Sequence, residues 1–193
     1  MAHPYAIAAV GEAILALLKV ARPADFSTAD FQLYNAESFK NPMKEGISLY
    51  LHRVEPASNT RNLPPRVAPD GRPFRPSLAI DLHFLLIAWA EKAALQQRLL
   101  GWAARTLEDT PILTASLVNQ GPPPHAFRDT ESIDVVMETL TILDMSAVWE
   151  VAKPNIQPCI AYFVRMLTLD SEVEVFEGEA AQTRVFGLGK ATP

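Results

Sequence analysis

Three side chains that could do acid–base chemistry or bind a metal lie on two apolar, strand-like segments. Asp81 and His83 stand two positions apart in "RPSLAIDLHFLLIAWA" (residues 75–90), and His52 stands in "GISLYLHRVEP" (residues 46–56). Alternate residues share one face of a strand at a separation of about 7 Å, so Asp81 and His83 are neighbours there. His52 would face them if the two strands are adjacent. An aspartate beside histidines is typical of a general acid–base pair or of part of a metal site.

Either role requires more than the sequence specifies. A metal site needs three convergent ligands, and a catalytic pair needs a nucleophile within hydrogen-bonding reach. The chain has no glycine-rich phosphate loop, no G-x-S-x-G elbow, no H-E-x-x-H helix and no paired cysteines. We therefore expect Asp81 and His83 to be structural polar residues, with no catalytic residue, no metal and no cofactor. A small enzyme or ligand-binding domain built on Asp81, His83 and His52 remains the alternative.

Composition and charge narrow the class of protein. The 193 residues are 49% hydrophobic and 20% charged, which is typical of one globular domain with a well-filled core. A net charge of −5 provides no field that would hold a polyanion, so we expect no nucleic-acid partner. Cys159 is the only cysteine, which excludes an internal disulfide and favours a buried, inert thiol. The apolar run Phe84–Ala90 is far shorter than the roughly 20 residues that cross a bilayer, so we expect no membrane insertion.

The spacing of apolar residues predicts an α+β domain with a mixed or antiparallel sheet covered by helices on one side. Recurrence every three or four positions predicts a helix over 7–18 that Pro23 ends, and another over 91–110. A short helix is predicted over 144–152, with Asp144 or Ser146 as its cap. Alternation or an apolar run predicts strands over 46–56, 78–87, 132–140 and 157–169, whereas most of 26–46 shows no steady period.

Two segments of opposite charge flank the strongest strands. Residues 57–76 contain five prolines and four arginines, which predicts an extended loop that reaches outward. Residues 170–182 contain five acidic residues and no basic ones, so we divide the chain into a core domain (1–170) and an acidic C-terminal arm or tail (171–193). This segregation predicts that the basic loop of one subunit meets acidic surface on another subunit or on a partner. The predicted interface residues are Arg61, Arg66, Arg72, Arg75, Glu172, Glu174 and Glu177.

Four segments in order resemble one known family. They are "VGEAILALL", "ISLYLHRVEPASNTRNLPPR", "PSLAIDLHFLLIAWAEKAALQQRLLGWAARTLEDTPIL" and "SAVWEVAKPNIQPCIAYFVRML". Together they are similar to the N-terminal domain family of tail-terminator, or tube-cap, proteins of extracellular contractile injection systems. The Photorhabdus virulence cassette and the antifeeding prophage are examples of such systems. The resemblance covers most of residues 5–170.

The resemblance implies a structural role without catalysis. Such caps form a sixfold ring that ends growth of the inner tube and joins it to the last ring of the contractile sheath. The implied fold is that of phage tail terminators, and the implied partners are a second copy of the chain, the inner-tube protein and the sheath protein. The implied location is the bacterial cytoplasm during assembly, followed by a phage-tail-like particle that can be released. A tail-completion adaptor of a true phage is a further alternative, and larger relatives carry an additional region after the position of Asp170.

Overall fold

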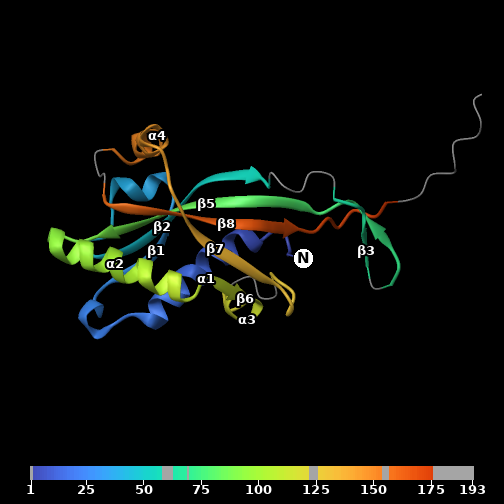
Figure 1. Cartoon of the computed structure of the whole chain (residues 1–193), viewed down its shortest axis with the longest axis horizontal. Helices are drawn as coiled ribbons and strands as arrows, with labels where there is room; N and C mark the ends of the chain where they lie inside the picture. The colour runs from blue at the N-terminus through green and yellow to red at the C-terminus, as the bar shows by residue number, and fades with distance from the viewer. Residues whose placement is uncertain (1, 58–62, 69, 122–125, 154–156, 176–193) are drawn as a thin grey trace, which may run out of the picture.

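The domain is built on one mixed sheet, seen in a computed structural model that describes residues 2–57, 63–68, 70–121, 126–153 and 157–175 (Figure 1). Within those residues six strands follow the order β1-β2-β5-β8-β7-β6. The strands are β1 (Asp30–Tyr34), β2 (Gly46–Pro56), β5 (Leu78–Trp89), β6 (Ile112–Thr114), β7 (Ser132–Glu138) and β8 (Cys159–Leu169). β1 is parallel to β2, and the other neighbouring pairs are antiparallel. The predicted α+β class with a mixed sheet is confirmed.

β5 lies inside the sheet and divides the core into two parts. Its residues Leu82, Phe84 and Leu86 belong to a large hydrophobic cluster on one face. Leu85 and Ile87 belong to a smaller cluster on the other face. Every residue from Leu82 to Trp89 is buried, so both faces are covered along this part of the strand. A nearly continuous apolar run is the pattern that such a strand requires.

Three helices cover the face that carries the large cluster (Figure 1). They are α1 (Ala6–Ala21), α2 (Ala93–Asp109) and α3 (Ala115–Val118). In α1 the stripe of Val10, Ile14 and Leu18 is fully buried, as the spacing predicts. α1 ends before Pro23 because proline disfavours helical backbone in the residue before it, and Arg22 is already extended.

The opposite face is covered at one end only. There the 3-10 helix η2 (Ala36–Lys40) and the helix α4 (Ile142–Ala152) pack over the smaller cluster (Figure 1). The prediction of helices on one side was therefore incomplete. The predicted cap of α4 was also wrong, because the helix begins at Ile142 and its N-cap is Thr141. The Thr141 hydroxyl accepts a hydrogen bond from the Asp144 backbone N–H at 3.1 Å, which satisfies a free donor of the first turn.

A narrow ribbon projects from the end of the sheet where β8 finishes (Figure 1). It contains β3 (Arg66–Val67) and β4 (Pro73–Phe74), an antiparallel pair separate from the main sheet. Residues 171–175, which follow β8, lie against β4. We call these parts, the described residues 66–68, 70–75 and 171–175, the arm. No helix among the residues that the structure describes is long and apolar enough to cross a membrane.

Candidate functional site

His83 is the centre of a charged cluster on the face of the sheet that α4 leaves uncovered. Its side chain is 5% exposed, and Nδ1 lies 2.8 Å from Oε2 of Glu138. Nε2 lies 3.2 Å from Oε1 of Glu55. Nη2 of Arg53 lies 3.3 Å from Nδ1 of His83. The ring of Phe163 stacks on the imidazole, with 5.9 Å between the two ring centroids. The cluster therefore joins side chains from β2, β5, β7 and β8.

Asp81 does not take part in that cluster. Its Oδ1 accepts a hydrogen bond from the backbone N–H of Met166 at 2.7 Å. The pairing of β5 with β8 shifts register at this point, and Met166 has a left-handed φ of 53°. Met166 is thus the extra residue of a β-bulge, and the Asp81 carboxylate provides the hydrogen-bond acceptor that its backbone N–H would otherwise lack. The predicted structural role of Asp81 agrees with this contact, although its partner is a backbone group and not His83.

His52 approaches His83 without joining it. The two ring centroids lie 6.1 Å apart. Nε2 of His52 is buried and has no hydrogen-bond partner among the described residues. Burial lowers the pKa of His52, and the nearby His83 and Arg53 lower it further. His52 is placed this way because β2 carries a register shift between Leu51 and Arg53.

The charged side chains around His83 also contact one another. Arg53 lies 3.6 Å from Glu55 and 3.6 Å from Glu138, so acidic and basic groups alternate around His83. Such an arrangement stabilises the pairing of strands, and among the described residues the polar side chains that contact the imidazole are those of Arg53, Glu55 and Glu138. Within the described part of the chain, no group of three histidine, cysteine or acidic side chains could hold a metal ion. Sequence reasoning missed Glu55 and Glu138, because their approach to His83 depends on the order of the strands.

The arm holds most of the predicted interface residues, and its centre is Phe74. The guanidinium carbon of Arg66 lies 4.3 Å from the Phe74 ring centroid, and that of Arg72 lies 5.6 Å from it. Arg66 also donates to the Ser171 carbonyl at 3.1 Å and lies 3.6 Å from a carboxylate oxygen of Asp170. Two cations thus cover an aromatic ring that is only 9% exposed, which stabilises a ribbon with little core of its own.

The acidic segment pairs with β4 through one β-bridge, between Glu174 and Phe74. Arg75 donates its backbone N–H to the Val173 carbonyl at 2.9 Å, and Val175 donates to the Pro73 carbonyl at 2.9 Å. The side chains of Arg72 and Glu174 form a close ion pair. Oppositely charged residues that were predicted to meet between subunits therefore meet within one chain.

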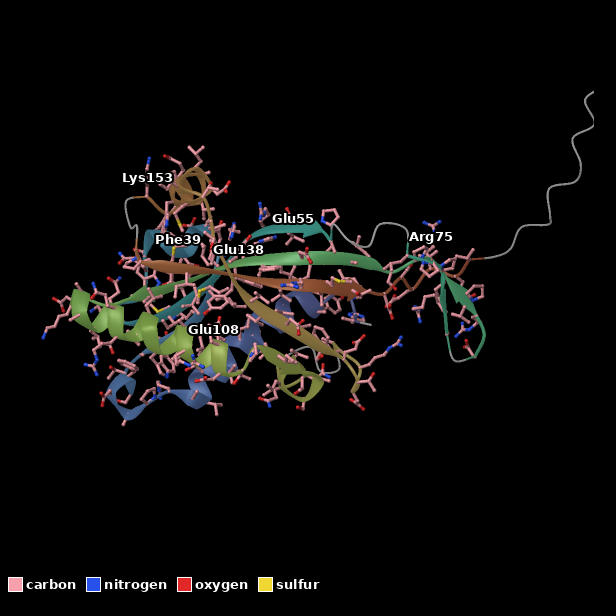
Figure 2. The ribbon with its side chains drawn as sticks, in the orientation of Figure 1. Phe39, Glu55, Arg75, Glu108, Glu138 and Lys153 are labelled. Carbon is pink, nitrogen blue, oxygen red and sulfur yellow. The ribbon has the colours of Figure 1, made fainter. Side chains whose placement is uncertain are left out.

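The remaining predicted interface residues differ in their surroundings. Nε2 of His3 lies 3.6 Å from Oε1 of Glu172, and both side chains are exposed. The side chain of Arg75 points outward from the arm and is exposed (Figure 2). Arg61 and Glu177 lie outside the described residues. Whether any of these side chains contacts another subunit or the sheath stays a prediction.

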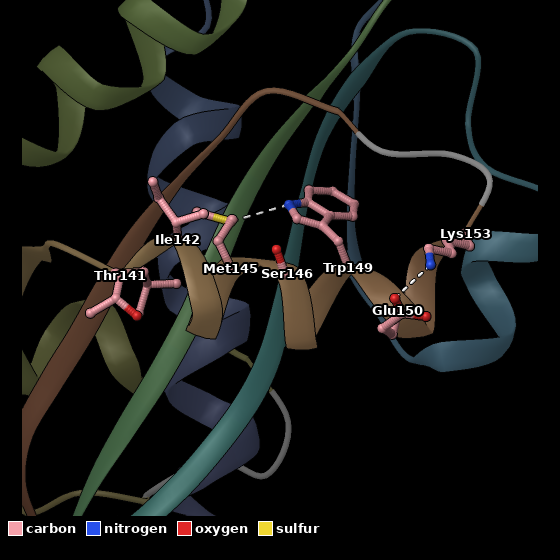
Figure 3. Close-up of a pocket in the computed structure, with 8 residues that line it drawn as sticks. Thr141, Ile142, Met145, Ser146, Trp149, Glu150 and Lys153 are labelled. Carbon is pink, nitrogen blue, oxygen red and sulfur yellow. Dashed lines mark hydrogen bonds and ion pairs between the residues drawn. The ribbon is translucent and has the colours of Figure 1, made fainter.

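An apolar hollow beside α4 completes the set of candidate sites (Figure 3). Its volume is about 510 Å³, and Leu140, Ile142, Met145 and Trp149 contribute to its wall. Trp149 donates its indole N–H to the Met145 sulfur at 3.1 Å. The Cys159 sulfur lies 3.7 Å from the same sulfur, and burial raises the pKa of this thiol to about 11. The thiol is therefore protonated at neutral pH and is a poor nucleophile.

Comparison with known proteins gives one family and four matching structure chains, among them the two that follow. The family model described as the Pvc16 N-terminal domain matches residues 9–183. No curated protein matches the chain. The cryo-EM structure of the PVC sheath/tube terminator, from an extracellular contractile injection system in its extended state, is similar with a TM-score of 0.59 and 14% identity. The tube-terminating cap of the anti-feeding prophage is similar with a TM-score of 0.56 and 13% identity.

The two similar structures are longer than this chain. The alignment with the PVC terminator covers 97% of this chain and 63% of that one. The alignment with the anti-feeding prophage cap covers 91% of this chain and 60% of that one. The shared part is thus nearly the whole of this chain and less than two thirds of either relative. At these identities the likeness shows a common fold.

Proposed function

The chain belongs to the Pvc16 N-terminal domain family, and from this premise we propose that it is a structural cap of a phage-tail-like contractile injection system. The cap forms a ring of identical subunits, most simply a hexamer, that ends the growth of the inner tube. It contacts the inner-tube protein on one side and the last ring of sheath protein on the other. The observation that carries the proposal is that the fold matches a sheath/tube terminator over 97% of this chain.

The geometry of the charged cluster supports a role without catalysis. Asp81 binds the backbone of a bulge, and the carboxylates of Glu55 and Glu138 occupy both nitrogens of His83. A base that is fully engaged by structural partners has no free nitrogen for a substrate. No observation favours the enzyme alternative or the adaptor of a true phage. The cap would act in the cytoplasm during assembly and remain in the particle.

The arm supports the proposed contacts with other subunits. It extends beyond the main sheet, and it carries the exposed guanidinium of Arg75 and the exposed carboxylate of Glu172. A ribbon of two short strands and one bridged segment is at best marginally stable by itself, because an isolated two-stranded hairpin buries little apolar surface. We therefore retain Arg75 and Glu172, with the arm residues Arg66, Arg72 and Glu174, as proposed contacts of the assembled ring or of the sheath.

The test is electron microscopy of the purified chain, alone and with the inner-tube and sheath proteins of the same system. Rings, or rings that cap the ends of tubes and limit their length, are the expected result. A matched sample receives the same concentration of an unrelated acidic protein of similar size. A chain that stays monomeric in every sample and leaves tube length unchanged contradicts the proposal.

A further inference from the structure

β2 has a free edge along its second half. β1 pairs with β2 from Gly46 to Tyr50, and then the chain turns away into η2. From Leu51 to Pro56, β2 pairs with β5 on one side, and no described residue pairs with its other side. The backbone N–H of Ala57 donates to the carbonyl of Ala79 in β5. In an antiparallel pair the backbone groups of every second residue point toward the partner strand, so those of Glu55 and Arg53 also point toward β5. The N–H and C=O of Val54 therefore point away from β5, toward the free edge. Such an edge accepts another strand.

An apolar groove lies beside this edge, where β1 stops. It has a volume of about 370 Å³, and its wall includes Tyr5, which precedes α1, Ile7 of α1, Leu33 of β1 and Leu51 of β2. Tyr5 is 61% exposed and Leu33 is 38% exposed, so the groove is open to solvent. A strand that continued the line of β1 would direct every second side chain into it. The groove therefore fits an extended segment with apolar residues at alternate positions.

The same chain carries a segment of this kind in its arm. Residues 171–175 read Ser-Glu-Val-Glu-Val, so Val173 and Val175 share one side and Glu172 and Glu174 share the other. Val173 is 50% exposed. The backbone groups of Val173 and Val175 bond to β4, which leaves those of Glu174 on the opposite edge, where no described residue pairs with them. The segment is thus extended where it bridges β4, and its outer edge is unpaired among the described residues.

The free strand and the free edge cannot meet within one chain. The segment continues β8, and β5 lies between β8 and β2. A contact between copies would use two different surfaces, and repeated contacts of that type close into a ring when the rotation allows it. An added strand with its valines in the groove would place its glutamates on the face that carries Arg53, whose guanidinium Glu55 and Glu138 also contact.

We propose that residues 171–175 of one copy pair with Leu51–Pro56 of the next copy and place Val173 in its apolar groove. The contact extends the main sheet across the subunit boundary and explains why the arm projects from the domain. This inference rests on the proposed function, because it assigns the contact that closes the ring.

Crosslinking tests the contact directly. Two single variants, Val54→Cys and Val173→Cys, are made in a Cys159→Ser background, mixed, assembled and treated with a short bismaleimide. We expect a covalent dimer in the mixture and none with either variant alone. The matched control replaces Val173→Cys by Val67→Cys, an exposed valine on β3 at the other edge of the arm.

The outcomes separate this inference from the proposed function. Rings that form normally but give no dimer, or equal dimer with Val67→Cys, overturn the contact and leave the cap role standing. A specific dimer without any effect on tube length supports the contact and contradicts the cap role. A second variant, Val54→Pro, removes the outward N–H at an edge where proline is tolerated. We expect the Tm of the Val54→Pro monomer to be close to that of the Val54→Ala monomer, whereas Val54→Pro should no longer form rings. Rings that persist in Val54→Pro contradict the pairing.

Discussion

Nδ1 of His83 lies 2.8 Å from a carboxylate oxygen of Glu138, although β8 separates the strands that carry the two residues. The Glu138 side chain therefore crosses β8 to reach the imidazole. The contact ties β5 to β7 directly, and the Nε2 contact with Glu55 adds β2. One buried histidine thus connects three strands by charge-assisted hydrogen bonds, which are stronger than neutral ones.

Removing the His83 side chain should destabilise the fold. His83→Ala leaves the Glu138 carboxylate, whose side chain is 18% exposed, without its histidine partner. We expect the free energy of unfolding in urea to fall by about 1–3 kcal/mol, the typical cost of an unsatisfied buried group. His3→Ala is the matched control, because that side chain is 42% exposed. If His83→Ala and His3→Ala lose equal and small amounts of unfolding free energy, the cluster around His83 contributes little to stability.

Asp81 should be replaceable by asparagine but not by alanine. Asp81→Asn keeps a side-chain oxygen that can accept the Met166 N–H, whereas Asp81→Ala removes it. We expect Asp81→Ala to lose about 1–2 kcal/mol of stability and Asp81→Asn to lose clearly less, as measured by thermal unfolding. An enzyme built on a charged Asp81 would instead lose its activity equally in both variants. Equal destabilisation by the two changes argues against the bulge contact.

His52 should make the folded state sensitive to acid. Burial lowers the pKa of His52 below its usual 6.5 in the folded protein. The unfolded chain therefore binds more protons as the pH falls through that range, so stability decreases on acidification. We expect the loss of Tm between about pH 7.5 and about pH 5.5 to be smaller in His52→Gln than in the natural chain. If Tm falls equally in His52→Gln and in the natural chain over this pH range, groups other than His52 cause the acid sensitivity.

Phe74 should hold the arm together without affecting the core. Phe74→Ala removes the ring that Arg66 and Arg72 cover. We expect trypsin to cleave after Arg66 faster than in the natural chain, while the Tm of the domain changes little; the Arg72–Pro73 bond resists trypsin because proline follows the arginine. Val67→Ala is the control, since Val67 is 66% exposed in the same ribbon. If both variants are cleaved at the natural rate, the cation–π contacts do not order the arm.

Cys159 should be unreactive until the domain unfolds. Burial raises the pKa of its thiol to about 11, so the thiolate fraction is very small at neutral pH. Labelling by iodoacetamide at about pH 8 should be slow in buffer and fast in denaturing urea. Rapid labelling of the folded chain, with its circular dichroism unchanged, would contradict a protonated thiol in this half-buried position.

Local patterns predicted several elements because their causes are local. The stripe of Val10, Ile14 and Leu18 is a property of nearby residues, and so is the apolar run of β5. The strand β1 had no comparable signal, since only Phe31 and Leu33 alternate in it and it is held by pairing with β2. The start of α4 was misplaced because Asp144 and Thr141 are both good caps, and only the path of the backbone chose Thr141.

The sequence by itself determined the α+β class, the extents of the main helices and strands, and a resemblance to tube caps. It also placed charges of opposite sign in residues 57–76 and 170–182. Only the tertiary structure decided which charges meet, because strand order and two register shifts lie beyond local patterns. These long-range pairings turned Asp81 toward a bulge, joined His83 to Glu138, paired Arg72 with Glu174, and left one edge of β2 free.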